Sequence, residues 1–217
     1  MGCRRPPPAL AGLAVLTAAV LVGGCGGGGP SAADGTAKAG ESRTAVAAAY
    51  WKVRPALPDS LDTPNGRGAF TACGKDDPHG KGAIRYGIED YLTPKDDSVT
   101  MAQLLSGVRD ALAPQGWTFT PVDIPEASMP DPRREPLHGW SAQHGGVTLR
   151  LTLHDRSDGQ PGAGYLDVLG GCGKFGKAQQ RLLAAYRDGG SRDSYRPTAA
   201  APHPVPTGFP TTQAESQ

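Results

Sequence analysis

The sequence predicts an α+β domain in which a small antiparallel sheet, a meander, is covered on one face by helices. Apolar residues over 101–112 repeat at helical spacing, whereas leucines and polar residues alternate strictly over 147–154. A third segment, 84–89, also alternates, so strands are expected both before and after the patterned helix. Elements in this order favour one sheet with the helices gathered on one side of it.

The first half of the domain is predicted to contain a helix, a long loop, a strand and a second helix. Residues 44–54 form a short predicted helix that Pro55 ends, and residues 55–82 are expected to be a loop because Pro, Gly, Asn and Asp occur throughout. The second helix follows the alternating strand, with Ser98 as its N-cap and Pro114 just beyond its end. Its apolar stripe comprises Met101, Leu104, Leu105, Val108, Ala111 and Leu112.

The second half is predicted to be a series of strands closed by a helix. Residues 117–122 begin it as a strand, and residues 123–136 form a charged, Pro-rich loop of the kind that often carries recognition. Two paired strands follow. A strand over 164–169 and a helix over 177–187 complete the domain.

A two-residue turn at Gly145-Gly146 determines the register of the predicted hairpin. Residue 144 then pairs with residue 147, and residue 138 pairs with residue 153. His138 therefore lies on the face that carries the leucines, whereas His154 points to the opposite face. A metal ion needs three or four converging ligands, so these two histidines are not expected to hold one together.

The N-terminus has the composition of an export signal. Arg4 and Arg5 supply a short positive region, and an uncharged apolar run extends from Ala9 to Val22. These 14 residues are too few to cross a bilayer core of about 30 Å, which needs roughly 20 residues. The run is therefore interpreted as the apolar region of a signal peptide.

The residues at the end of this run are Leu21-Val22-Gly23-Gly24-Cys25. They resemble the lipobox of bacterial lipoproteins, in which an aliphatic residue and two small residues precede a cysteine. The resemblance covers about 25 residues and extends to small lipoproteins of bacteria with Ala/Gly/Pro/Arg-rich proteomes, the actinobacterial type. It implies that a diacylglyceryl group is added to Cys25, that a signal peptidase cuts between Gly24 and Cys25, and that the protein is held at the outer face of the cell membrane. Two acyl chains at one residue suffice for stable attachment.

Three alternatives for the N-terminus were weighed. The start Met1-Gly2-Cys3 is similar to that of myristoylated proteins, but Pro6 stands where that pattern requires Ser or Thr. The pair Arg4-Arg5 leaves a twin-arginine route open beside the general export route, which we favour because three prolines follow directly. Ordinary secretory cleavage that leaves the Cys25 thiol free is the third alternative.

The chain is expected to divide into four parts. Residues 1–24 are the signal peptide, and residues 25–43 are the lipidated cysteine and a flexible tether rich in Gly, Ala and Ser. Residues 44–195 form the folded domain, and residues 196–217, which contain five prolines, form a disordered tail. If the tail instead packs against the domain, its candidate residues are Val205 and Phe209.

Two cysteines remain in the predicted domain after lipidation and removal of the signal peptide. They are Cys73 and Cys172, and an exported protein meets an oxidising compartment, so we predict that they form a disulfide. A disulfide that closes a loop of about 100 residues contributes roughly 4.7 kcal/mol to the free energy of unfolding by chain-entropy reasoning.

Composition and motifs exclude several functional classes. Lys and Arg number 22 and Asp and Glu 21, a balance that argues against nucleic-acid binding. The sequence has no P-loop, no G-x-S-x-G and no glycine-rich dinucleotide motif after a strand. Neighbouring carboxylates in Glu89-Asp90 and Asp96-Asp97 face apart or lie in turns. We expect neither a metal nor another cofactor.

The function predicted from the sequence is that of a monomeric, lipid-anchored extracytoplasmic module that binds an envelope ligand or protein without catalysis. The alternative is an envelope hydrolase with an unfamiliar site, which a cleft joining His79 or His154 to carboxylates and a serine would favour. A cleft lined by aromatic residues would favour binding. Trp51, Trp117 and Trp140 are the candidates for such a cleft, although Trp117 and Trp140 are expected to lie in the core.

Overall fold

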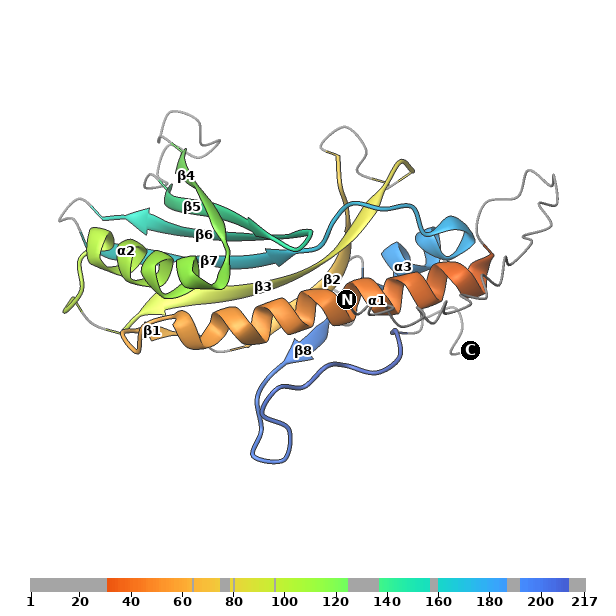
Figure 1. Ribbon diagram of the computed structural model, residues 1–217. Helices are drawn as coiled ribbons and strands as arrows, with labels where there is room; N and C mark the ends of the chain where they lie inside the picture. Colours follow the sequence, from red (N-terminus) through yellow and green to blue (C-terminus); the bar gives the residue numbers. More distant parts are fainter. Residues whose placement is uncertain are drawn as a thin grey trace, which may run out of the picture.

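The computed structural model describes residues 31–63, 65–74, 79, 81–95, 97–124, 137–156, 160–186 and 192–210. Within these residues, three α-helices and eight strands form one α+β domain, as predicted (Figure 1). The predicted signal peptide, Cys25 and the loop over 125–136 lie outside the described residues.

The chain passes through its elements in the order α1 (Ala32–Val53), β1 (Leu61–Asp62), β2 (Gly66–Ala72), β3 (Ile84–Pro94), α2 (Met101–Leu112), β4 (Thr118–Ile124), β5 (Leu137–His144), β6 (Val147–Asp155), β7 (Pro161–Leu169), α3 (Gln179–Tyr186) and β8 (Asp193–Tyr195). Single 3₁₀ turns follow α1 (η1, Arg54–Ala56) and α2 (η2, Ala113–Gln115), and another precedes α3 (η4, Gly176–Ala178). The strands are antiparallel and lie in the order β4-β5-β6-β7-β3-β2-β8, while β1 pairs with the end of β3.

The three helices cover one face of this sheet, and no element within the described residues covers the opposite face. Along β3, Ile84, Tyr86 and Ile88 are buried against the helical side, whereas Glu89 and Tyr91 are exposed. Figure 1 shows α1 running along β3 with α2 on the same side. The Trp140 indole of β5 donates a hydrogen bond of 3.2 Å to the carbonyl oxygen of Leu105 in α2. The two-residue alternation therefore separates a core face from a polar face.

The predicted hairpin is confirmed in register as well as in position. His144 pairs with Val147 and His138 pairs with Leu153. Gly145 and Gly146 have φ angles of 55° and 78°, the left-handed region that a two-residue hairpin turn of this type requires at both positions. Glycine adopts this region without a Cβ penalty.

The predicted tether is wrong from Ser31 onward, because α1 begins at Ala32 rather than at Thr44. Ser31 is the N-cap: its hydroxyl accepts a hydrogen bond of 3.1 Å from the backbone N–H of Asp34, whose carboxylate accepts one in return from the N–H of Ser31. A Cβ at Gly35 would collide with the carbonyl oxygen of Phe175, and Ala39 is fully buried. The small residues that indicated a linker therefore let the helix approach the core closely.

The segment 55–82, predicted to be a loop, contains β1 and the strand β2, which lies between β3 and β8. Gly66 and Gly68 contributed to that prediction, but both glycines are buried in β2. A side chain at Gly68 would collide with the Tyr86 hydroxyl, and one at Gly66 would press on Ile88 and Tyr50. These glycines therefore make room for buried aromatic side chains.

Residues 196–210 form neither a helix nor a strand, and residues 196–203 are exposed, but the prediction of a disordered tail is wrong where the segment contacts the domain, at Pro204 and over Gly208 and Phe209. The Trp51 indole donates a 3.0 Å hydrogen bond to the carbonyl oxygen of Pro204. The ring of Phe209 lies 6.1 Å from that of Phe70 and packs on the core, whereas Val205 is 40% exposed. Of the two candidate docking residues, Phe209 alone makes this contact.

Two further predictions concern single residues. The N-cap of α2 is Thr100 rather than Ser98, because Thr100 and Gln103 form a reciprocal capping box. The disulfide between Cys73 and Cys172 is confirmed, with Cα atoms 6.0 Å apart. It joins the end of β2 to the segment that follows β7, beside a bridge between Ile84 and Gly173.

Candidate functional site

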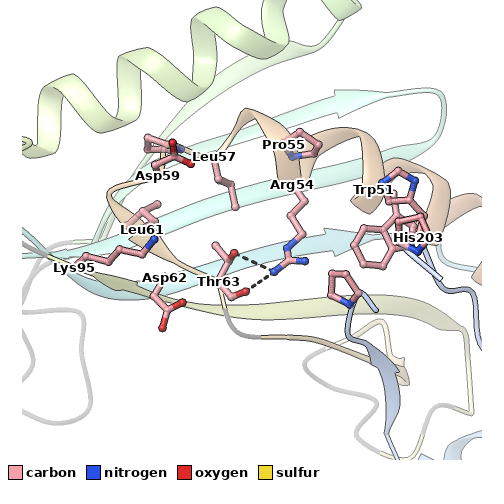
Figure 2. Close-up of a pocket in the computed structure, with 13 residues that line it drawn as sticks. Trp51, Arg54, Pro55, Leu57, Asp59, Leu61, Asp62, Thr63, Lys95 and His203 are labelled. Atoms are coloured by element: carbon pink, nitrogen blue, oxygen red, sulfur yellow. Dashed lines mark hydrogen bonds between the residues drawn. The ribbon is translucent and has the colours of Figure 1, made fainter. Parts of the chain in front are cut away.

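A pocket of about 460 Å³ opens at the C-terminal end of α1 (Figure 2). Four separate segments line it: the end of α1 with η1, the turn that contains β1, Lys95 just after β3, and the C-terminal segment after β8. Its apolar lining comprises Trp51, Pro55, Leu57, Pro58, Leu61, Pro197 and Pro202. Its polar lining comprises Arg54, Asp59, Asp62, Thr63, Lys95 and His203.

Local sequence explains how the pocket is shaped. Pro55 stands at the start of η1, where it ends α1 and turns the chain away. The short strand β1 then pairs with the end of β3, with Leu61 opposite Pro94. The backbone N–H of Lys95 donates to the carbonyl oxygen of Ser60 at 2.9 Å. This pairing brings the Lys95 side chain to the same rim as Asp62, as Figure 2 shows.

Arg54 connects the pocket to the core. Its guanidinium donates hydrogen bonds to the carbonyl oxygen and, at 3.1 Å, to the hydroxyl oxygen of Thr63. Its Nε lies 4.0 Å from the carboxylate of Asp90, which is completely buried. The Arg54 side chain is only 19% exposed, and its guanidinium carbon lies 5.8 Å from the Trp51 ring. Arg54 is therefore a fixed wall of the pocket rather than a mobile surface charge.

Asp90 lies beneath this wall, on the helical face of β3. The Tyr50 hydroxyl donates a 2.7 Å hydrogen bond to it. Burial raises the pKa of Asp90, and the hydrogen bond from Tyr50 and the charge of Arg54 oppose this rise. Burial also raises the pKa of Tyr50, as does the neighbouring Asp90 carboxylate. The tyrosine therefore stays protonated and continues to donate to Asp90.

The C-terminal segment completes the aromatic wall. Because the Trp51 indole is bonded to Pro204, the segment is fixed at the mouth of the pocket. The imidazole of His203 lies 5.2 Å from the Trp51 ring at an interplanar angle of 33°, beside it in Figure 2. The pocket thus depends on a segment that the sequence patterns left outside the domain.

The predicted site residues are distributed as follows. All three tryptophans are buried in the core, as expected for Trp117 and Trp140; Trp51 also lines this pocket, and Trp117 also lines another hollow, beside His144. His79 lies between β2 and β3, where its carbonyl oxygen accepts a bond from Gln180. His154 lies in β6 opposite Leu137, so neither of these histidines lines the pocket. Within the described residues, no group of three or more His, Cys, Asp or Glu side chains could hold a metal ion.

Sequence reasoning missed the polar lining of the pocket. Arg54, Lys95 and His203 belong to segments that are far apart in the chain and meet only after folding. The cluster Pro197, Pro202 and Pro204 beside His203 is the one local signal, since prolines lower the entropic cost of fixing a segment without secondary structure.

No family model, curated protein or solved structure matches this chain. Among the described helices, none combines the length and the apolar character that crossing a bilayer requires. The basis for a functional assignment is therefore the pocket and the N-terminal sequence.

Proposed function

We propose that this protein is a cell-envelope lipoprotein that is anchored through Cys25 and binds a small amphipathic molecule in the pocket beside Trp51. The observation that carries the binding proposal is the pocket itself. Its volume of about 460 Å³ falls in the range of small-molecule sites, and polar groups converge on it from several segments.

The lining indicates the chemistry of the ligand. Trp51, Leu57 and the prolines offer an apolar wall for a ring or a short aliphatic body. Lys95 at the rim offers a cation that is not engaged in any ion pair with another described residue. A molecule with an apolar body and an anionic group satisfies both surfaces.

The pocket is tested with 1-naphthalenesulfonate, which has this chemistry, titrated into the full-length chain in detergent. We expect saturable binding that quenches the fluorescence of Trp51, because the naphthalene ring would lie against the indole. The Trp51→Phe variant should lose this quenching. Lys95→Ala should weaken binding about three- to fivefold, as expected for one exposed charge. Lys177→Ala, which removes an exposed lysine outside the pocket, is the matched control, and equal losses in both variants would refute the assignment.

The anchor rests on the lipobox resemblance and has its own test. Cells that express the protein are fed an alkyne-labelled fatty acid, and the wild-type chain should become labelled and partition into the membrane fraction. The Cys25→Ser chain should lose the label. The Cys3→Ser chain should retain it, because the lipobox resemblance does not include Cys3. Labelling of the Cys25→Ser chain would show that Cys25 is not the modified residue.

A further inference from the structure

The open face of the sheet carries a row of charged residues that crosses four neighbouring strands. Arg67 of β2 is opposite Glu89 of β3, Glu89 is opposite Asp167 of β7, and Asp167 is opposite Arg150 of β6. Residues paired across antiparallel strands point to the same side of the sheet. Four charged side chains therefore stand together on the face opposite the three described helices.

A hollow of about 190 Å³ lies next to this row. Its floor is made of small or apolar residues, Ala69, Gly87 and Leu169. A Cβ at Gly87 would come within 2.8 Å of a Leu169 methyl group, so the floor has no room for a larger side chain there. Arg85 and Arg192 join the charged row at the rim.

The charge around the hollow is predominantly positive. Four guanidinium groups, from Arg67, Arg85, Arg150 and Arg192, face two carboxylates. None of the four makes a hydrogen bond or a close ion pair with another residue in the described part of the chain. The Nε of Arg85 is buried, and none of the described residues accepts a hydrogen bond from it. Burial, followed by the charge of Glu89, raises the pKa of Asp167, while the charges of Arg150 and Arg85 oppose this rise. An oxyanion is the ligand that such a group of guanidiniums would bind.

Two exposed tyrosines lie one step along the same face. Tyr91 and Tyr165 are paired across β3 and β7, with ring centroids 5.4 Å apart. They are 47% and 39% exposed, which is unusual for aromatic side chains on a polar face. A second hollow, of about 350 Å³, has Asn65 and Tyr91 in its lining and shares Arg67 and Glu89 with the first. The aromatic and charged surfaces are therefore continuous.

The spacing of these surfaces matches a sugar that bears an anionic group. The tyrosine pair and the charged row are two residues apart along each strand, or roughly 6.7 Å. This distance is close to the width of one pyranose ring. A ring could therefore lie on the tyrosines with its hydroxyl groups directed at Glu89 and Asp167, while its oxyanion reaches the arginines.

We propose that the open face of the sheet, formed by these two hollows and the tyrosine pair, binds an anionic saccharide. Phosphate or carboxylate on the sugar contacts Arg67, Arg85 and Arg150. The sugar ring packs on the face of one tyrosine and the edge of the other, because the rings of Tyr91 and Tyr165 meet at 63°. The ligand is either a free sugar acid or the repeating unit of an acidic polysaccharide. This site lies on the face opposite the helices and is separate from the pocket beside Trp51.

The test is isothermal titration calorimetry on the full-length chain in detergent with glucose 6-phosphate, glucose, inorganic phosphate and polygalacturonate. If the ligand is a free anionic sugar, we expect glucose 6-phosphate to bind at least tenfold more tightly than glucose or phosphate alone. Preferential binding of polygalacturonate would identify a polymer as the source. Phosphate binding as tightly as glucose 6-phosphate, or no binding of either acidic saccharide, would overturn the proposal.

Two variants assign the binding to this face. Arg150→Gln and Tyr165→Ala should each weaken binding of the preferred saccharide by tenfold or more, and both residues are exposed, so unfolding curves should remain those of the wild type. Arg109→Gln, which removes an exposed arginine of α2, is the matched control and should bind normally. Unchanged binding by Arg150→Gln and Tyr165→Ala would overturn the assignment. The naphthalenesulfonate titration reports on the other pocket, so the two proposals can fail separately.

Discussion

Asp90 and Asp193 are both buried carboxylates that accept a hydrogen bond from a tyrosine hydroxyl. Each also lies near an arginine, which belongs to α1 at Asp193 and to the following turn η1 at Asp90. Around Asp193, the hydroxyls of Tyr86 and Tyr186 donate at 2.5 and 3.0 Å, and Arg43 donates at 3.5 Å. Around Asp90, one tyrosine donates, and Arg54 stands off at 4.0 Å. Asp193 therefore accepts more hydrogen bonds from side chains than Asp90 does.

The difference continues in the two arginines. Arg43 is buried, donates to the carbonyl oxygen of Gly208, and lies 4.3 Å from the centre of the Phe209 ring. The Asp193 cluster thereby joins α1, β8 and the C-terminal segment. Arg54 instead turns toward Thr63 and forms a wall of the pocket. A buried carboxylate paired with tyrosine and arginine therefore holds the core together at Asp193, whereas at Asp90 it supports a wall of the pocket.

The strongest test of this difference removes Asp193. In Asp193→Ala, Arg43 is left as a buried charge without its carboxylate, and two tyrosine hydroxyls lose their acceptor. We expect the free energy of unfolding to fall by about 3–5 kcal/mol in urea titrations. Asp110→Ala, which removes an exposed surface pair, should change it by less than about 1 kcal/mol. A loss no larger than that of this control would show that the cluster does not hold the domain together.

High pH should destabilise the Asp193 cluster, which also includes Tyr195, because its hydroxyl lies 3.0 Å from that of Tyr86. Burial raises the pKa of Tyr195 to about 12, and the pKa values of Tyr86 and Tyr186 are raised for the same reason. Above pH 10, the unfolded chain loses these protons while the folded chain keeps them, so stability is lost as the pH rises from about 10 to about 12. The contribution of Tyr195 alone is about 2–3 kcal/mol.

This alkaline transition can be followed by tyrosinate absorbance together with circular dichroism. The absorbance of the buried tyrosines should rise only as the helical signal is lost. Tyr195→Phe should unfold over a less steep pH range, because one of the linked protons is absent. Ionisation of the buried tyrosines in a chain that remains folded would contradict this assignment.

Removal of Asp90 should have a smaller effect than removal of Asp193. In Asp90→Ala, Tyr50 loses its acceptor, but Arg54 keeps its bonds to Thr63 and its partial access to water. We expect a loss of about 1–3 kcal/mol. Asp90→Asn should recover part of it, since an amide oxygen can still accept from Tyr50. Urea titration of both variants decides this, and a loss greater than that of Asp193→Ala would reverse the ranking of the two clusters.

The smallest expected effect concerns the C-terminal segment. Phe209→Ala removes a ring that contacts Arg43 and Phe70, and we expect it to reduce stability by about 1 kcal/mol. Val205→Ala is the matched control, because this residue is exposed and should change stability by less than about 0.5 kcal/mol. Equal thermal shifts in the two variants would show that the segment does not stabilise the domain.

Local patterns predicted the elements that local physics determines. The hairpin register followed from the turn glycines, and the position of α2 followed from its apolar stripe. The disulfide followed from having two cysteines in a domain that the sequence predicts to be exported. Each of these predictions depends on neighbouring residues or on simple counting. None requires knowledge of what packs against the element.

The errors arose where small residues serve a distant contact. Gly35 and Gly68 resemble linker or loop glycines in the sequence, and only the positions of Phe175 and Tyr86 show why no side chain fits there. The candidate pocket also escaped prediction, because its walls come from four segments that are separate in the sequence. Trp51 was foreseen as a cleft residue, but its neighbour His203 could not be placed without the fold.

The early start of α1 limits how far the pocket can travel. With Cys25 held in the bilayer as proposed, the chain from Cys25 to Ala32 can extend by at most about 25 Å. The 22 residues of α1 add a rigid length of about 33 Å before the pocket is reached. The pocket can therefore lie at most roughly 60 Å from the membrane surface. Molecules that diffuse farther out are beyond its reach, so the anchor would act as a spatial filter on what the protein encounters.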